Sequence, residues 1–151
     1  MVTVEPLTAE TWRDVLDLDV TEQQRALLDF PSMVAFLAES RFHLDFTPCA
    51  IRADGTVVGF VSYGSPAEDR TRWWIPLLVI DRDHQRQGYG RAALDAVVAD
   101  VRSRAPDAVA LGLSFHRSNE VAARLYRGAG FVEADTNDRG ERVAWLSLRQ
   151  G

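Results

Sequence analysis

Residues 85–91 read Gln85-Arg86-Gln87-Gly88-Tyr89-Gly90-Arg91, and two segments of different hydrophobic pattern meet there. The preceding run, Ile75 to Ile80, is apolar apart from a proline and predicts a buried strand, whereas Ala92 to Arg104 repeats apolar residues at helical spacing. A glycine-containing turn from a strand into a helix leaves the first N–H groups of the helix unpaired, at its partly positive end. The sequence therefore predicts an anion site, with phosphate as the usual guest.

Three kinds of phosphate-binding loop, and an ordinary glycine turn, compete to explain this stretch. A Walker loop requires Gly-Lys-Ser/Thr, which the chain does not contain here. The dinucleotide fingerprint fits loosely through Gly88, Gly90 and Ala93, but the next strand, Ala110 to Ser114, does not end in the acidic residue that this motif needs. The third pattern, Gln/Arg-x-x-Gly-x-Gly/Ala, is matched by Gln85 and the two glycines, which remove side chains that would hold a phosphate away from the backbone.

Composition limits the class of protein. The chain has 151 residues, 46% hydrophobic and 26% charged, which is ordinary for a globular domain with a core. A net charge of −5 argues against a nucleic-acid partner and is compatible with a cationic substrate. Cys49 is the single cysteine, so no disulfide framework is expected. No apolar run reaches the ~18 residues of a membrane helix and the start does not resemble a signal peptide, so we expect a cytoplasmic protein without a membrane partner.

The pattern along the chain predicts a mixed α/β sheet with helices on both faces. Strands are expected at Val2–Pro6, Pro48–Arg52, Val57–Tyr63, Arg72–Ile80, Ala110–Phe115, Phe131–Ala134 and Arg142–Leu148. Helices are expected near Trp12, from Glu22 with an apolar face of Leu27, Leu28 and Phe30 before a stop at Pro31, over Met33–Arg41 and Ala92–Arg104, and after a cap at Ser118 or Asn119. Gly59 predicts a bulge, and Pro76 predicts a bulge or local splay within its strand.

A second motif lies downstream: Asn119-x-x-Ala122-x-x-Leu125-Tyr126-x-x-x-Gly130-Phe131. It resembles the second signature of the GNAT superfamily of N-acetyltransferases, whose acetyl-CoA pyrophosphate loop the stretch from Gln85 to Gly90 also resembles. The two motifs have the order and spacing of that family. Within it, Ile80-Asp81 followed by residues 84–94 is similar to the spermine/spermidine (diamine) acetyltransferase-like branch, from which Trp73-Trp74 and Leu77-Leu78 depart.

The resemblance implies one GNAT-like domain over residues 1–151. Its central sheet would be mixed, mostly antiparallel, of about seven strands, splayed at the cofactor site and flanked by about four helices. The implied cofactor is acetyl-CoA, with Tyr126 near the thioester sulfur. The other implied cofactor-binding residues are Leu78, Val79 and Ile80 through their backbone to the pantetheine arm, Gln85, Arg86, Gln87, Gly88, Tyr89, Gly90 and Arg91 at the pyrophosphate, and Asn119 at the pantetheine or the far end of the cofactor.

The chemistry of acetyl transfer assigns roles to few of these groups. A neutral amine must attack the thioester carbonyl; a backbone N–H of Val79 or Ile80 is the candidate donor to the oxyanion, and Tyr126 is the candidate proton donor to the departing thiolate. We expect direct transfer in a ternary complex, without a covalent intermediate on Cys49. The general base stays open, with Glu22, Glu39, Asp45, Glu68 and Glu133 as possibilities. His43, His84 and His116 lack metal-ligand spacing, so we expect no metal site.

Simpler interpretations remain for several of these residues. Tyr126 is also compatible with a core aromatic, Asn119 with a helix cap, and Arg86 and Arg91 with solvated rim charges. Trp73 and Trp74 should lie on opposite faces of their strand, so one of them could hold a cationic amine.

The sequence favours one kind of acceptor for the acetyl group and leaves several alternatives open. The favoured acceptor is a small primary amine, polyamine-like because Asp14, Asp17, Asp19 and Glu22 make the first third acidic. Within the same enzyme class a peptide or protein N-terminus, an amino acid or an aminoglycoside would also serve. A non-catalytic acyl-CoA-binding sensor is the alternative of another class, and a homodimer is compatible with either function.

Overall fold

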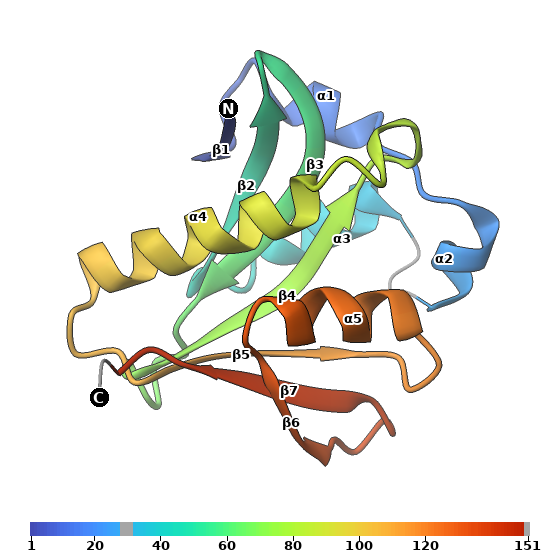
Figure 1. The fold of residues 1–151 in the computed structure, drawn as a ribbon. Helices are drawn as coiled ribbons and strands as arrows, with labels where there is room; N and C mark the ends of the chain where they lie inside the picture. Colours follow the sequence, from blue (N-terminus) through green and yellow to red (C-terminus); the bar gives the residue numbers. More distant parts are fainter. Residues whose placement is uncertain (28–31, 150–151) are drawn as a thin grey trace.

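The computed structural model describes residues 1–27 and 32–149, which form a seven-stranded sheet with helices on both faces (Figure 1). The strand order is β1-β2-β3-β4-β5-β7-β6, and every neighbouring pair is antiparallel except β4 and β5. The elements are β1 (Val2–Pro6), α1 (Trp12–Leu16), α2 (Glu22–Leu27), α3 (Met33–Ser40), β2 (Phe46–Ala53), β3 (Thr56–Gly64), β4 (Arg72–Ile80), a 3-10 turn (Arg82–His84), α4 (Tyr89–Arg104), β5 (Ala110–Phe115), α5 (Glu120–Gly128), β6 (Val132–Thr136) and β7 (Arg142–Ser147).

This architecture confirms the predicted mixed, mostly antiparallel sheet. In the described part of the chain there are five α-helices, as the pattern along the chain predicts and one more than the approximate number that the family resemblance implies. The start of α2 follows from a reciprocal cap: Thr21 Oγ1 accepts from the N–H of Gln24, and the Gln24 side chain accepts from the N–H of Thr21, both at 3.2 Å. The predicted apolar face at Leu28 and Phe30, and the stop at Pro31, lie outside the described residues.

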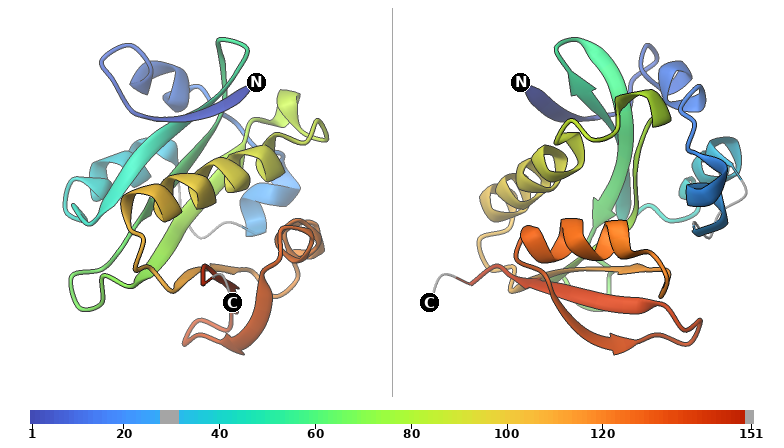
Figure 2. Two further views of the ribbon diagram at one scale, coloured as in Figure 1. Left: turned by 60° about the vertical axis from the view of Figure 1, so that its left-hand side comes forward. Right: turned by 45° about the vertical axis from the view of Figure 1, so that its right-hand side comes forward.

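Helices lie on both faces of the sheet (Figure 2), and each face carries its own core. On one face α4 packs against β1, β3 and β4 through a fully buried stripe that includes Leu94, Val97 and Val101, and α5 lies beside it. On the other face α1 packs on β3 and α3 on β2, around Phe60. Burying one such aliphatic side chain contributes about 1.5–3 kcal/mol. We call these the α4/α5 face and the α1/α3 face.

The sheet divides in the middle, between β4 and β5. Their parallel pairing runs from Arg72 with Ala110 to Ile75 with Leu113 and then ends, although β4 continues to Ile80. Figure 1 shows the two strands diverging beyond that point. The register of β4 against β3 also shifts between Trp74 and Leu77, so Pro76 lies in an irregularity of its strand. The bulge or splay predicted from the proline is therefore confirmed, because a residue without an N–H cannot extend the ladder.

A second predicted irregularity occurs in β3. The register between β2 and β3 shifts where Ile51 pairs with Gly59 and Arg52 pairs with Val57. A Cβ added at Gly59 would lie 2.5 Å from the carbonyl oxygen of Val79, so only glycine admits this approach of β4. The bulge predicted at Gly59 is confirmed. Among the helices of the described residues, none is long and apolar enough to cross a bilayer.

Candidate active site

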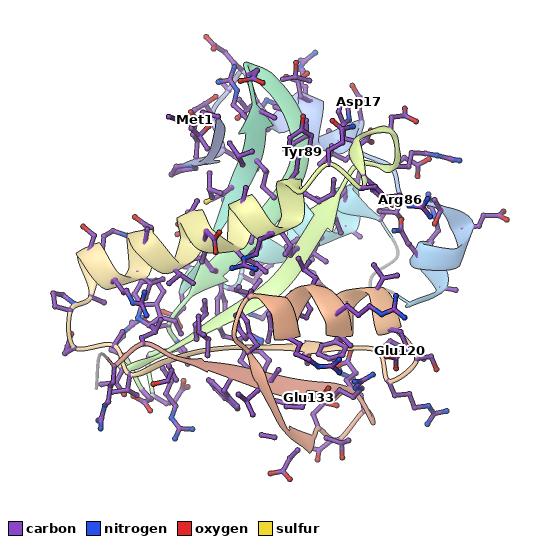
Figure 3. The ribbon with its side chains drawn as sticks, viewed as in Figure 1. Met1, Asp17, Arg86, Tyr89, Glu120 and Glu133 are labelled. Atoms are coloured by element: carbon purple, nitrogen blue, oxygen red, sulfur yellow. The ribbon has the colours of Figure 1, made fainter. Side chains whose placement is uncertain are left out.

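The loop before α4 presents bare backbone N–H groups. Gly88 is the N-cap of α4 in the left-handed conformation, with φ 79°, and no side chain caps this helix, whereas Ser32 and Asn119 cap α3 and α5. In the described part of the chain, the N–H groups of residues 86–91 make no hydrogen bond to another protein atom. Arg86, exposed and also at positive φ (63°), lies in this loop beyond the end of β4 (Figure 3). Unpaired donors at a helix N-terminus favour an anion.

The side chain of Gln85 anchors the loop instead of reaching outward. Its Nε2 donates to the carbonyl of Ile80 at 3.0 Å and to Gln24 Oε1 at 2.7 Å, and its Oε1 accepts from Gln24 Nε2 at 2.8 Å. Arg91 is also engaged, because its Nη1 donates to the carbonyl of Gly128 at 2.7 Å and its Nε to Asp95. The loop is thereby tied to α2 on one side, while the start of α4 is tied to α5 on the other.

The two glycines of the loop have different surroundings. A Cβ at Gly88 would meet no atom within 4 Å, so the space beside this residue is open. A Cβ at Gly90 would lie 3.3 Å from Leu125 Cδ2 and 3.9 Å from Ile80 Cγ1. Gly90 therefore serves the close approach of α4 to α5 and to the end of β4, whereas Gly88 leaves room for a guest.

Backbone groups of β4 face the gap that β5 leaves. The N–H of Asp81 donates to Val58 in β3, and the Val79 carbonyl also points toward β3, as its 2.5 Å approach to the Cβ position of Gly59 indicates. Because backbone groups alternate along an antiparallel strand, Leu78 and Ile80 turn theirs away from β3. The Ile80 carbonyl is taken by Gln85, which leaves the Ile80 N–H and both groups of Leu78 directed at the gap.

The end of α5 fixes the ring of Tyr126. Gly130 has φ 99°, its N–H donates to the carbonyl of Arg127 at 3.0 Å, and the N–H of Phe131 donates to the carbonyl of Tyr126 at 2.9 Å. These two bonds form a Schellman motif, which brings the side chains of its third-last helical residue and of the residue after the glycine together. The rings of Tyr126 and Phe131 accordingly lie 5.8 Å apart, and Phe115 at the end of β5 lies 5.4 Å from Tyr126 on another side.

The Tyr126 phenol is buried but keeps an unsatisfied hydroxyl. The residue is 9% exposed, and burial raises the pKa of its phenol to about 12. Among the described residues its hydroxyl has no hydrogen-bond partner, and it is not one of the fully enclosed unpaired atoms, which are Arg52 Nε and Trp73 Nε1. A core tyrosine normally pairs its hydroxyl. A protonated phenol whose hydroxyl has no protein partner is the state that a donor to a developing anion requires.

Asn119 acts as a cap in this structure. Its Oδ1 accepts from the N–H of Ala122 at 3.1 Å, which opens α5 at residue 120. This contact uses only the carbonyl side of the amide, so the Nδ2 group is still a donor for a ligand.

Arg142 ties the terminal hairpin to the start of α5. Its guanidinium binds both oxygens of Glu133 at 2.6 and 2.7 Å, and Nη1 donates to Glu120 Oε1 at 3.0 Å. It also lies 5.0 Å from the centre of the Phe115 ring. Glu120 and Glu133 are labelled in Figure 3. Hydrogen bonding to Arg142 lowers the pKa of Glu133, and both oxygens of this carboxylate are engaged by the guanidinium.

The other carboxylates considered from sequence are not brought together. Asp45 pairs with Arg70 at 3.2 Å. The remaining three carboxylates are exposed at the surface: Glu22, Glu39 and Glu68. A half-buried carboxylate that the sequence did not single out, Glu141, contacts Ser114 at the end of β5. Glu141 lies two residues before Val143 of β7 and so faces the same side of the sheet as Val143. This position identifies Glu141 as a neighbour of Ser114 only once the β5–β7 register is known.

A hollow of about 190 Å³ opens on the α1/α3 face beside the end of β4. Its wall is mostly apolar and includes two carboxylates, Asp19 and Asp81, and one guanidinium, Arg25. Asp19 is already paired with Arg25 and Arg82. Burial acts to raise the pKa of Asp81, but the N–H groups of Asp19 and Asp83 and the His84 ring together lower it. Trp73 and Trp74 do lie on opposite faces, and Trp74 packs 5.4 Å from Trp145 over Gly112.

Cys49 is buried in the main core, and its environment predicts an inert thiol. Burial and the nearby Asp100 raise the pKa of its thiol to about 12, although Arg104 acts in the opposite direction. At pH 7.5 this leaves about a thousandth or less of the thiolate that an exposed cysteine would have. We expect iodoacetamide to leave Cys49 unmodified in the native protein, and Cys49→Ala to keep kcat within about twofold of the wild type. Mass spectrometry of the alkylated protein and a steady-state assay check this; a Cys49→Ala variant that loses turnover while remaining folded would contradict it.

Comparison with known proteins agrees with this geometry. The acetyltransferase (GNAT) family matches residues 8–131. The chain is 26% identical over 148 residues to a spermine/spermidine N(1)-acetyltransferase of Bacillus subtilis (strain 168), covering 94% of this chain and 95% of that protein. The structure of spermidine N-acetyltransferase from Vibrio cholerae in complex with CoA and spermine has a TM-score of 0.74 at 16% identity, over 97% of this chain and 95% of that one. The ribosomal-protein-S18-alanine N-acetyltransferase from Escherichia coli has a TM-score of 0.73 at 21% identity, over 100% and 96%.

The chain belongs to the GNAT family of acetyltransferases. It is an N-acetyltransferase whose cofactor is acetyl-CoA, and it is similar in sequence to the spermine/spermidine branch of that family.

Proposed function

We propose that this enzyme transfers the acetyl group of acetyl-CoA to a primary amine of a small, polyamine-like molecule, in a ternary complex. The observation that carries the proposal is the arrangement around the gap between β4 and β5. The bare N–H groups of residues 86–91 lie beyond one end of β4, outward backbone groups of Leu78 and Ile80 line the gap, and the Tyr126 phenol lies beneath α5 beside the end of β5.

The residues present fit acetyl-CoA. The open space at Gly88 and the unpaired N–H groups of the loop would receive the diphosphate, with Arg86 adding charge at the rim. Leu78 and Ile80 would pair with the amide groups of the pantetheine arm, as a strand pairs with an open edge. When bound, acetyl-CoA supplies an activated acyl group on a thiol leaving group.

Two groups of the chain would then act on the developing charges. The Ile80 N–H is the one of the two predicted oxyanion donors that turns toward the gap, since Val79 turns toward β3. The phenol of Tyr126, whose burial raises its pKa to about 12, stays protonated and donates toward the leaving sulfur.

The acceptor would approach from the α1/α3 face, because α4 and α5 cover the other. The hollow at the end of β4 lies on that face, with Asp19 and Asp81 in its wall beside Arg25, which already pairs with Asp19. The similarity to spermine/spermidine acetyltransferases is what supports a polyamine-like acceptor.

A thiol-release assay with acetyl-CoA and a panel of amines tests the proposal. The panel contains spermidine, spermine, diamines, amino acids, an aminoglycoside and a peptide with a free N-terminus. We expect the highest kcat/KM on a polyamine or diamine. Turnover confined to the peptide, an amino acid or the aminoglycoside would overturn the polyamine assignment, and no release with any amine would overturn the proposed function.

A further inference from the structure

We infer that Glu141 is the carboxylate that takes the proton from the acceptor amine, at the rim of the gap between β4 and β5. The inference rests on the proposed function and names a catalytic residue for it. It follows from three observations: where Ser114 stands relative to the split in the sheet, how Glu141 is held beside it, and which carboxylate oxygen is left without a partner.

Ser114 marks the rim of the gap. It is the first residue of β5 after Leu113, whose pairing with Ile75 is the last between β5 and β4. Leu113 belongs to the core of the α4/α5 face, so Ser114, its neighbour along the strand, turns toward the α1/α3 face. That is the face from which the acceptor approaches.

Glu141 reaches this rim from the neighbouring strand. Ser114 pairs with Val143, and Glu141 precedes Val143 by two residues and so shares its face. Its Oε1 lies 3.5 Å from Ser114 Oγ, and its side chain is 15% exposed. At this length the contact with Ser114 is weak, so the serine marks where the carboxylate lies but does not hold it there.

The turn that joins β6 and β7 fixes the carboxylate through one oxygen. Asn137 Nδ2 donates to Glu141 Oε1 at 2.9 Å, and Arg139 Nη2 lies 3.1 Å from the same atom. Asn137 is itself locked, since its Oδ1 accepts from the N–H groups of Arg139 and Glu141, both at 3.0 Å. Nothing in the described portion of the chain hydrogen-bonds to Oε2. A substrate ammonium can therefore use this second oxygen.

The proton balance then closes. The ammonium gives one proton to the Glu141 carboxylate, and the neutral nitrogen forms its bond to the acetyl carbon as the carbon–sulfur bond breaks. The second nitrogen proton leaves as the amide forms and restores the phenol of Tyr126, which gives its own proton to the sulfur. The reaction yields amide, thiol and one proton released to solvent when Glu141 ionises again.

The test compares Glu141→Gln with Asp138→Asn, which removes an exposed carboxylate from the same turn. With spermidine, or the amine of the panel with the highest rate, Glu141→Gln should lower kcat/KM at pH 7 by about 10²-fold. The deficit should shrink at least about tenfold by pH 9.5, because an amine with a pKa of about 10.4 increasingly arrives neutral. Asp138→Asn should match the wild type, and both variants should keep the wild-type affinity for CoA and melting temperature.

A relocated carboxylate guards against a local change in the turn. Adding Ser114→Glu to Glu141→Gln restores a carboxylate from β5, and should recover at least about tenfold of the lost rate. A Glu141→Gln enzyme within twofold of Asp138→Asn, or a deficit that is constant across pH, overturns the role of Glu141 while leaving the proposed function intact. A wild type that is inactive on every amine overturns both.

Discussion

Replacing Tyr126 by phenylalanine should lower kcat by about 10²-fold or more, while the affinity for acetyl-CoA stays within about twofold. The substitution removes one oxygen from a ring that Phe115 and Phe131 hold in place. That oxygen makes no hydrogen bond within the described residues, so its loss should not destabilise the fold. Thiol release measured at saturating acetyl-CoA, together with calorimetric titration of CoA, separates the rate from the binding.

The same variant distinguishes the enzyme from a cofactor sensor. A module that only reports the level of acyl-CoA needs the anion loop but not the phenol, so it would be insensitive to this change. A matched control is Tyr63→Phe, which removes a hydroxyl from the buried tyrosine of β3 that bonds Asp100. Turnover by Tyr126→Phe equal to that of the wild type and of Tyr63→Phe would remove the phenol from the mechanism.

The pH dependence of the rate offers a second check on Tyr126. Because burial raises the pKa of the phenol to about 12, its proton is retained throughout the range in which the protein is handled. The wild-type rate should therefore show no falling limb between pH 7 and about 10 from loss of this proton. At the ordinary tyrosine pKa of about 10, half of the phenol would be ionised at the upper end of that range. A decline in kcat centred well below 10 would contradict the buried donor.

The order of strands and helices was predictable because local signals agree with the global fold. Pro76 predicted the irregularity of β4, and Gly59 predicted the bulge in β3. The motif around Tyr126 also gave the position of the proposed donor. The placement of the Tyr126 ring could not be predicted, because the Schellman bonds at Gly130 and the contact with Phe115 depend on how α5 packs on β5.

The features of the site that could not be predicted from the sequence depend on contacts between residues far apart in the chain. Gln85 was expected at the diphosphate, yet its side chain binds Gln24, 61 residues earlier. Gly90 was expected to clear a phosphate, and its Cβ position instead faces Leu125 of α5. Glu141 was overlooked among many carboxylates because its meeting with Ser114 is set by the β5–β7 register. Hydrophobic pattern and capping signals act over a few residues, so they do not predict contacts between residues far apart in the sequence.

A valine at Gly88 should weaken the binding of CoA by about 10²-fold, corresponding to about 3 kcal/mol. The left-handed φ of 79° disfavours any L side chain, and the added atoms would enter the open space next to the bare N–H groups. Losing two hydrogen bonds from these donors to a charged diphosphate would cost about 1.5–3 kcal/mol each. Gly90→Val is a poorer test, because a Cβ added there would lie 3.3 Å from Leu125 and would disturb the contact of α4 with α5.

The control for this variant is Gly55→Val in the β2–β3 turn. Gly55 has φ 89°, and a Cβ there would also meet nothing within 4 Å, so the backbone strain is matched while the turn lies away from the loop. Both variants should lose a similar amount of stability, on the order of 1–2 kcal/mol, in denaturant unfolding. Only Gly88→Val should lose CoA affinity in calorimetry. If the two variants bound CoA equally well, the diphosphate would have to lie elsewhere, and the placement of the thioester beside Tyr126 would fail with it.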